Sequence, residues 1–250
     1  MAIVRVMPCL LLRGRGLVKT RKFKDPVYLG DPVNAVHIFN EKEVDELVLL
    51  DIDASREGRE PDYELVAEIA GECFMPIAYG GGIKTLDQVR KLIRCGVEKI
   101  VINSAATEST EVIRAAADLF GSQAVVGAID VKKTLLGGYR AFSKSGTVEV
   151  KIKLEDYVGN LLAAGVGEIF LNSIDRDGMM MGYDLQLIRH VANMVNVPVV
   201  ACGGAGTVQH LKEAVKEGGA TAVAAGSMFV FHGKLRGVLI NYPQDLRLER

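Results

Sequence analysis

The sequence predicts an α/β protein folded as one (β/α)8 TIM barrel, with residues 1–250 in a single domain and with a twofold repeat of half-barrels. Three observations carry this prediction. The chain of 250 residues has a length typical of this barrel, short apolar runs alternate with amphipathic stretches throughout, and two segments recur at one spacing. An open, doubly wound sheet is the alternative, but it needs fewer strands than the sequence offers.

The apolar runs are expected to be the barrel strands. Each run is apolar throughout rather than alternating, as expected for a strand that is covered on both faces in a parallel sheet. The predicted strands are Ile3–Leu12, Glu46–Asp51, Met75–Tyr79, Lys99–Asn103, Ala124–Asp130, Glu168–Asn172, Val197–Ala201 and Thr221–Ala225.

The amphipathic stretches between these runs predict the outer helices. Thr85, followed three residues later by Gln88, is a capping-box pattern that marks the start of one of them. The predicted helices are Val33–Asn40, Asp62–Glu72, Thr85–Cys95, Ser109–Phe120, Leu154–Ala164, Leu185–Met194, Val208–Glu217 and a weaker one after Lys234.

An internal repeat supports the closed barrel. Met75–Thr85 resembles Val197–Thr207, and Val44–Asp53 resembles Val166–Asp175. In both pairs the second copy begins 122 residues after the first (197 − 75 and 166 − 44). This spacing is close to half the chain, so the sequence indicates duplication of a four-strand half-barrel.

Two longer connections follow the first and fifth predicted strands. Lys132–Val150, with its glycine and serine turns, is expected to be a hairpin, and Arg13–Pro32 is expected to be a long loop. Active sites of this barrel lie at the carboxyl ends of the strands, so both connections are predicted to overhang the site as lids.

The composition excludes several classes of function. Thirty Lys and Arg residues against 31 Asp and Glu leave no basic excess for nucleic-acid binding. No apolar run approaches the ~20 residues needed to cross a membrane, and the amino terminus lacks the layout of a signal peptide. The four cysteines are scattered, with no metal-ligand spacing, so we expect no disulfide, no metal and no cofactor, and a reducing cytoplasmic location.

Glycines and small polar residues follow four of the predicted strands and indicate two anion sites. Without a Cβ, a glycine lets backbone N–H groups approach a phosphate. The pair on strands seven and eight is the usual phosphate site of this barrel, and its repeat image on strands three and four predicts a second one. A ligand with two phosphates would fit both; the plainer interpretation is that these glycines only form tight turns. The predicted residues are Gly81, Gly82, Asn103 and Ser104 in one cup, and Gly203, Gly204, Gly226 and Ser227 in the other.

Carboxylates gather at the same predicted rim, as candidates for acid–base chemistry or for helix capping. Asp130 is the strongest acid–base candidate, because the apolar run before it delivers it into the mouth. The histidines form no cluster and are expected in surface or helical positions. The apolar triplet Met179–Met181, after the sixth strand, is expected to cover a ligand or partner or to pack under a lid. The other rim carboxylates are Asp51, Asp53, Asp175 and Asp177.

These motifs closely resemble the cyclase subunit of imidazole glycerol phosphate synthase along almost the whole chain. In that family a glutaminase docks on the amino-terminal face of the barrel, and ammonia crosses the barrel to a bisphosphorylated substrate at the other face. The resemblance adds Asp177 to the predicted substrate-binding residues. The matching segments are Gly30–Pro32, Glu46–Ile52, Gly80–Ile83, Lys99 with Asn103, Phe120–Val126, Ala128–Lys132, Ser173–Gly178 and Ala201–Gly206.

The resemblance also implies an ammonia gate at the barrel floor and a glutaminase contact beside it. The family has a ring of charged residues there, and Arg5, Glu46, Lys99 and Glu168 occupy the matching positions. Buried charges are costly unless they pair with one another, so a paired ring is expected. Glu98 matches an acidic position that faces the glutaminase in the family.

The family's pair of catalytic aspartates is incomplete. Asp130 matches the second acid, but Leu11 stands where the first is expected, and one acid–base group is commonly worth ~10²–10⁴ in rate. Further departures lie around the same mouth: Met179 and Asp53 where threonine is common, and Val27–Tyr28 in place of Arg-Asp. The floor is preserved while the mouth has changed.

The Pro8–Leu12 and Met75–Lys84 segments resemble a diverged subgroup linked to bacterial surface-polysaccharide (O-antigen) biosynthesis. There, a glutaminase-like protein and a separate sugar-modifying enzyme convert an acetamido group into an acetamidino group. The leading hypothesis is therefore an ammonia-conducting barrel subunit that takes a phosphorylated small molecule. A genuine cyclase of histidine biosynthesis, in which Asp53 or Asp177 replaces the missing acid, is the alternative. A non-catalytic scaffold that activates its glutaminase is a third.

Overall fold

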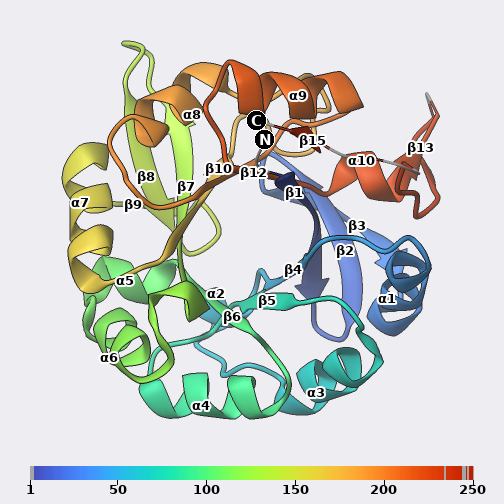
Figure 1. Cartoon of the computed structure of the whole chain (residues 1–250), viewed down its shortest axis with the longest axis horizontal. Helices are drawn as coiled ribbons and strands as arrows, with labels where there is room; N and C mark the ends of the chain where they lie inside the picture. The colour runs from blue at the N-terminus through green and yellow to red at the C-terminus, as the bar shows by residue number, and fades with distance from the viewer. Residues whose placement is uncertain (1–2, 234, 244–245, 247, 250) are drawn as a thin grey trace.

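The computed structural model, which describes residues 3–233, 235–243, 246 and 248–249, shows a closed barrel of eight parallel strands (Figure 1). Each strand pairs with its neighbours in parallel register, and the circle closes where β10 pairs with β7 on one side and β11 on the other. The predicted barrel is confirmed. Its strands are β1 (Ile3–Arg13), β4 (Leu47–Asp51), β5 (Ile77–Gly80), β6 (Lys99–Ile102), β7 (Val125–Lys133), β10 (Glu168–Ser173), β11 (Val199–Cys202) and β12 (Ala222–Ala225).

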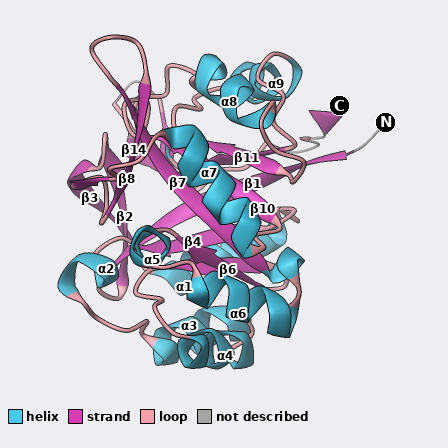
Figure 2. Cartoon of the chain, turned by 90° about the vertical axis from the view of Figure 1, so that its left-hand side faces the viewer, coloured by secondary structure: helices cyan, strands magenta, loops and turns pink. Residues whose placement is uncertain are grey.

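Seven helices of eight residues or more surround the described barrel, and each corresponds to a predicted one (Figures 1 and 2). None of the described helices has the length and apolarity required to span a membrane. The seven are α1 (Pro32–Glu41), α3 (Tyr63–Glu72), α4 (Leu86–Arg94), α6 (Glu111–Phe120), α7 (Leu154–Ala164), α8 (Leu185–Ala192) and α9 (Val208–Lys216).

The helix caps carry the internal repeat into the structure. Asp62 caps α3 and Asp184 caps α8, each by accepting a hydrogen bond from the backbone N–H three residues on, at 3.0 Å. Thr85 and Thr207 cap α4 and α9 in the same way. Both pairs are 122 residues apart (184 − 62 and 207 − 85), so equivalent helices of the two halves begin at equivalent residues.

The connection after the last barrel strand differs from the prediction. The short helix α10 (Ser227–Val230) is followed by a hairpin of β13 (Phe231–His232) and β14 (Gly237–Val238). Lys234 itself lies outside the described residues, but the described residues after it form a turn, β14 and β15 (Leu248–Glu249) and no helix, so the predicted helix there is wrong. Glycines at both ends of the turn disfavour a helix, and Gly233 has a φ of 70°. Three more short helices were not predicted: α2 (Ala54–Glu57), α5 (Ser104–Glu108) and the 3₁₀ turn η1 (Ser122–Ala124).

Both long connections are antiparallel hairpins. The predicted loop after β1 forms β2 (Gly16–Arg21) and β3 (Lys24–Gly30), and the predicted hairpin after β7 contains β8 (Tyr139–Ser143) and β9 (Val148–Glu149). Figure 2 shows β3, β8 and β14 on the side of the molecule opposite to the two chain ends. The hairpins therefore surround the carboxyl-terminal mouth of the barrel.

The barrel interior is packed with apolar side chains. A large cluster fills the space between strands and helices, and a second, smaller one lies inside the barrel. The inner cluster comes from alternate residues of the strands, as the pleat requires. Its members include Met7, Leu11, Val48, Ala78, Val101, Val126, Ala128, Phe170, Val200, Ala222 and Ala224.

Candidate functional site

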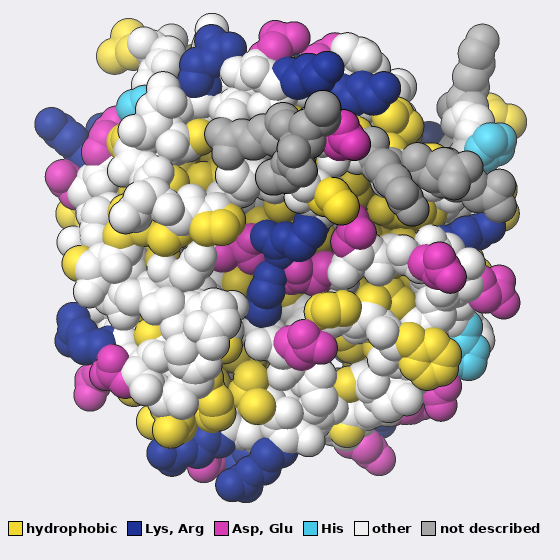
Figure 3. Space-filling model, viewed as in Figure 1, with side chains coloured by type: hydrophobic (Ala, Val, Ile, Leu, Met, Phe, Trp, Pro, Cys, Tyr) yellow, Lys and Arg dark blue, Asp and Glu magenta, His cyan; other side chains and the backbone are white. Residues whose placement is uncertain are grey.

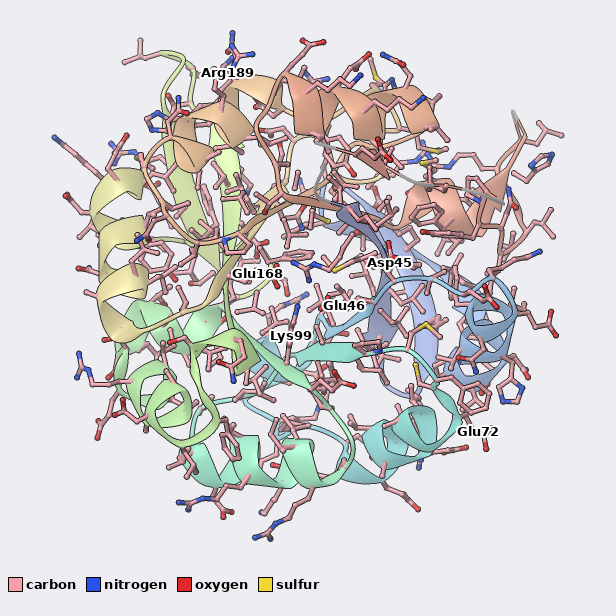
Figure 4. All side chains as sticks on the ribbon, viewed as in Figure 1. Asp45, Glu46, Glu72, Lys99, Glu168 and Arg189 are labelled. Atoms are coloured by element: carbon pink, nitrogen blue, oxygen red, sulfur yellow. The ribbon has the colours of Figure 1, made fainter. Side chains whose placement is uncertain are left out.

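Four charged residues form a closed ring at the amino-terminal floor of the barrel. Arg5 lies on β1, Glu46 immediately precedes β4, and Lys99 and Glu168 begin β6 and β10. Figure 4 shows Glu46, Lys99 and Glu168 pointing toward the barrel axis. Figure 3 looks onto this floor and shows basic side chains at its centre with acidic ones beside them. The residues predicted as a gate are therefore brought together.

Each cation of this floor ring contacts both carboxylates. Arg5 donates to Glu46 Oε2 at 2.5 Å and also pairs with Glu168, while Lys99 Nζ lies 2.9 Å from Glu46 Oε2 and 3.1 Å from Glu168 Oε2. The glutamate side chains are 4% and 6% exposed, but those of Arg5 and Lys99 are 32% and 21% exposed. Burial opposes the charged form of Arg5, but the two glutamates outweigh it and raise the pKa. The ring has no net charge, which makes its burial tolerable.

A pocket opens at the opposite end of the inner apolar cluster, at the carboxyl ends of the strands. It encloses about 130 Å³ and is lined by all eight residues of the two predicted phosphate cups, and by Leu11, Asp130 and Asp177. Glycine is required in both cups. A Cβ on Gly81, at a φ of 121°, would lie 2.4 Å from Asp51 O, and one on Gly204, at 117°, would lie 2.2 Å from Gly182 O.

Asp130 lies on β7 at the base of this pocket. Asn103 Nδ2 donates to Asp130 Oδ2 at 3.0 Å, and Asn172 flanks it on β10. Burial, reinforced by the charge of Asp177, raises the pKa of Asp130 to about 7, against the opposing hydrogen bonds of the two asparagines. A carboxyl group poised near neutrality can both donate and accept a proton.

Two buried acceptors beside Asp130 have no partner in the described residues. They are Asn103 Oδ1 and Asn172 Oδ1, one on each side of the carboxyl group. Buried polar atoms are almost always hydrogen-bonded, so unpartnered acceptors in a pocket wall suit a ligand that donates N–H or O–H groups. Asn172 was not predicted as a site residue; its signal was a polar residue at the carboxyl end of a predicted strand, where site residues of this barrel lie.

Asp177 holds the first hairpin over the pocket. Its carboxylate accepts from Lys19 Nζ at 2.9 Å and from Thr20 Oγ1 at 2.7 Å, both on β2. Burial opposes the charge of Lys19, but Asp177 outweighs it and raises the pKa of Lys19. The sequence alone did not single out Lys19, because a lysine in a predicted loop is ordinarily solvated.

The other rim carboxylates have local partners. Asp51 accepts from the backbone N–H groups of Asp53 and Ala54 at 3.1 and 3.0 Å, a capping role. Asp53 pairs with Arg13 at 3.0 Å and more loosely with Arg56, at 3.4 Å. Asp175 accepts from Lys133 N at 2.8 Å, which anchors the second hairpin.

Leu11 is buried, with an exposed fraction of 7%, and pairs with Val18 of β2 and Leu50 of β4. It contributes an apolar surface to the pocket and cannot exchange protons. Glu98 is exposed beside Lys99, where a partner on the floor could reach it. Met181 is 68% exposed, so this part of the Met179–Met181 triplet does not pack under a lid.

The remaining candidates carry no chemistry in the described part of the chain. His37 and His190 pair with Glu72 and Glu155 on exposed helix faces, as predicted. All four cysteines are free, although Cys9 and Cys202 line the pocket. The described residues contain no group of three His, Cys, Asp or Glu side chains that could hold a metal ion.

Fold and pocket together define a (β/α)8-barrel protein with a glycine-lined pocket at its carboxyl-terminal mouth and a ring of paired charges at its floor. Comparison with known families is more specific. A model described as "Histidine biosynthesis protein" matches residues 5–236, and the chain belongs to this family.

Three relatives extend along nearly the whole chain. A Pseudomonas aeruginosa protein named "Putative imidazole glycerol phosphate synthase subunit hisF2" is 59% identical over 245 residues, which covers 98% of both chains. A Leptospira interrogans protein named "Putative imidazole glycerol phosphate synthase subunit HisF" is 51% identical over 240 residues, covering 96% of this chain and 94% of its own. A Vibrio vulnificus protein of similar name, hisF3, is 49% identical, covering 96% and 92%.

Proposed function

We propose that this chain is the cyclase-like barrel subunit of a glutamine-dependent amidotransferase. In this proposal a glutaminase docks on the floor, near Glu98, and releases ammonia there. The ammonia passes the floor ring and the inner apolar cluster and reaches an acceptor in the mouth pocket. The observation that carries the proposal is the alignment of these three features along one barrel axis: a closed charged ring, an apolar interior and a polar pocket.

The apolar interior suits neutral ammonia. Neutral NH3 crosses an apolar passage far more readily than NH4⁺, whose desolvation is costly. The floor ring must rearrange for ammonia to enter, since Lys99 bridges both glutamates. Lys99 is partly exposed, like Arg5, and its unbranched side chain can rotate away from both glutamates, so in this proposal its movement opens the ring.

The polar pocket suits an acceptor with phosphate groups and a proton-transfer step. The two glycine cups bind phosphate in this proposal, and Asp130 donates or accepts the proton that amide or amidine formation requires. Leu11 leaves this site with one acid where the family resemblance implies two. From the resemblance of Pro8–Leu12 and Met75–Lys84 to the polysaccharide-linked subgroup, we propose that the acceptor is a phosphorylated surface-polysaccharide sugar that is amidinated together with a separate sugar-modifying enzyme, in the cytoplasm.

Imidazole glycerol phosphate formation in histidine biosynthesis is the second candidate, and the printed names of the relatives favour it. It would require Asp53 or Asp177 to act as the missing acid. Both are engaged, Asp53 with Arg13 and Asp177 with Lys19. A scaffold that only activates its glutaminase is a third candidate, favoured by the departures around the mouth.

Deletion of the gene in its host separates these candidates. The leading proposal expects loss of the acetamidino group from the surface polysaccharide, measured by mass spectrometry, with normal growth without histidine. Histidine auxotrophy would instead establish the cyclase. Complementation with Asp130→Asn tests the scaffold: unchanged product would show that the mouth does no chemistry.

The conduit is tested with the purified chain and its glutaminase. Lys99→Ala should uncouple the two subunits, so that glutamine-driven product falls at least tenfold relative to glutamine consumed. Product driven by added ammonium salts should fall much less. Lys91→Ala is the matched control, because Lys91 lies on the outer helix α4, away from the floor ring, where it pairs with Asp87 and lies over the ring of Tyr63. Restoring Leu11→Asp and assaying cyclisation of the histidine-pathway substrate then measures what the missing acid contributes.

A further inference from the structure

The β13–β14 hairpin, which replaces the expected last helix, brings an arginine to the rim of the second glycine cup. Its turn runs from Gly233 to Arg236, whose N–H donates to Gly233 O at 3.1 Å. The hairpin is tied back to α10, since Leu239 N donates to Val230 O at 3.0 Å. Figure 2 places β14 on the side of the molecule that carries the other mouth hairpins.

The guanidinium of Arg236 is held in one position by contacts on three sides. Nη1 donates to Gly178 O at 2.9 Å, Nη2 donates to Ser227 Oγ at 3.4 Å, and the group lies 4.6 Å from the ring centre of Phe231. Arg236 adopts a φ of 54°, which is strained for a residue with a Cβ. The fold thus tolerates a local cost to keep this arginine in place.

Ser227 and Gly178 both line the mouth pocket, so Arg236 stands directly behind its wall. Because Arg236 donates to Ser227 Oγ, the hydroxyl proton is free to point into the pocket, where Gly203, Gly204 and Gly226 form the rest of the cup. The arrangement orients a hydroxyl donor toward an anion and adds a positive charge behind it.

The charges around this cup are out of balance. Lys19 is compensated by Asp177, but no carboxylate among the described residues lies within ion-pair distance of Arg236 or Arg21. Burial, and then the charge of Arg21, lower the pKa of Arg236, and the more distant charge of Asp177, which Lys19 already neutralises, only partly opposes them. The first cup differs, because its nearby cations are paired: Arg56, which lines the pocket, lies 3.4 Å from Asp53, and Lys144, beside Ser104, lies 3.5 Å from Glu108.

We propose that Arg236 is the positioning residue of a phosphate subsite at the second cup: it orients the Ser227 hydroxyl and supplies the charge that favours a phosphate dianion. This inference rests on the proposed function, in which the same pocket takes a phosphorylated acceptor. It makes the two cups unequal, with the second binding phosphate more tightly and with a steeper dependence on salt.

The test is calorimetric titration of the full chain with inorganic phosphate, at two salt concentrations. Arg236→Met should weaken one class of site about tenfold to hundredfold, the range of a hydrogen bond to a charged group, and should flatten its salt dependence. Arg236→Lys, which keeps the charge, should recover part of the affinity. Arg140→Met is the matched control, since Arg140 pairs with Glu149 on the second hairpin at 3.8 Å. Circular dichroism verifies that each variant is folded.

Two further variants separate the possible outcomes. The loss of affinity in the double variant Ser227→Ala, Arg236→Met should be smaller than the sum of the losses in the two single variants, because part of the effect of Arg236 acts through the serine; strictly additive losses would overturn the positioning role. Ser104→Ala, in the first cup, should weaken the other site. Phosphate binding that depends on Ser104 but not on Arg236 would overturn this inference alone. A wild-type chain that binds no phosphate would overturn the phosphorylated acceptor as well.

Discussion

The two ends of the barrel treat their charges in opposite ways. At the floor, two cations and two carboxylates satisfy one another in a closed ring that needs nothing from outside. At the mouth, the described residues include a half-buried Asp130 that pairs with no cation, two asparagine oxygens without a partner, and Arg236, which forms no ion pair.

This difference separates a closure from a binding site. A satisfied ring stabilises the fold and must be disturbed to act, so it suits a gate. Unsatisfied polar groups cost stability and are repaid only when a ligand arrives, so they suit a substrate pocket. The residues that match the family are kept at the floor and replaced at several positions of the mouth, which is what the proposed function, with a retained ammonia supply and a changed acceptor, expects.

The largest effect is expected at the floor. Arg5→Met leaves two buried glutamates with Lys99 as their only ring partner, and should lower the free energy of unfolding by about 3–5 kcal/mol in urea titrations. Adding Glu46→Gln should recover part of the loss, because it removes the excess negative charge. A double variant as unstable as Arg5→Met would mean that the arginine acts by packing and that the ring is not electrostatically closed.

Removing the Asp130 charge at the mouth should raise the free energy of unfolding, whereas removing Arg5 at the floor lowers it. The pKa of Asp130 is raised to about 7 in the fold, so the native state binds more protons than the unfolded state between about pH 4 and 7, and stability falls as the pH rises through that window. Asp130→Asn should therefore stabilise the protein at pH 8 by about 2–4 kcal/mol, and change it little at pH 4. Denaturation at the two pH values measures this, and equal effects at both would contradict it.

Breaking the ion pair between Asp177 and Lys19 at the mouth should lower the free energy of unfolding, as breaking the floor ring does. Asp177→Ala leaves Lys19 buried without a partner and should cost about 2–3 kcal/mol, less than at the floor because the hairpin can swing Lys19 into water. The loss should be local. Limited proteolysis should cleave between β2 and β3 in the variant sooner than in the wild type, whereas uniform destabilisation with no preferred cleavage would show that the hairpin is held elsewhere.

The smallest effects are expected in the repeated helix caps, away from both ends. Thr85→Ala should cost about 1 kcal/mol, and Thr207→Ala somewhat less. Thr85 has a full capping box, with Gln88 returning a bond to its backbone N–H, whereas Thr207 has only the side-chain bond to His210 N. Thermal unfolding measures the stability that each variant loses. A larger loss in Thr207→Ala than in Thr85→Ala would contradict a stabilising role for the reciprocal bond of Gln88.

Much of this architecture could be predicted from local patterns. Apolar runs of about five residues predicted the barrel strands, with ends that differ from the observed ones by a few residues. The capping box of Thr85 and Gln88 is present as predicted. The prediction was wrong for the segment after α10, because it continued the alternation of strand and helix past Lys234, although glycines flank the turn there. The site was predicted as a set of residue types at strand ends, and all eight cup residues line one pocket.

The sequence by itself predicted the eight strands, the half-barrel repeat and the residues of the two cups, because these depend on periodicity and on spacing along the chain. The residues of the floor ring and the missing acid at Leu11 were predicted from the family resemblance. Only the tertiary structure decided which charges are paired. Glu168 meets Arg5 across 163 positions, and Lys19 meets Asp177 across 158. Whether a charge is compensated depends on distance and burial in three dimensions, and that is what distinguishes the closed floor from the receptive mouth.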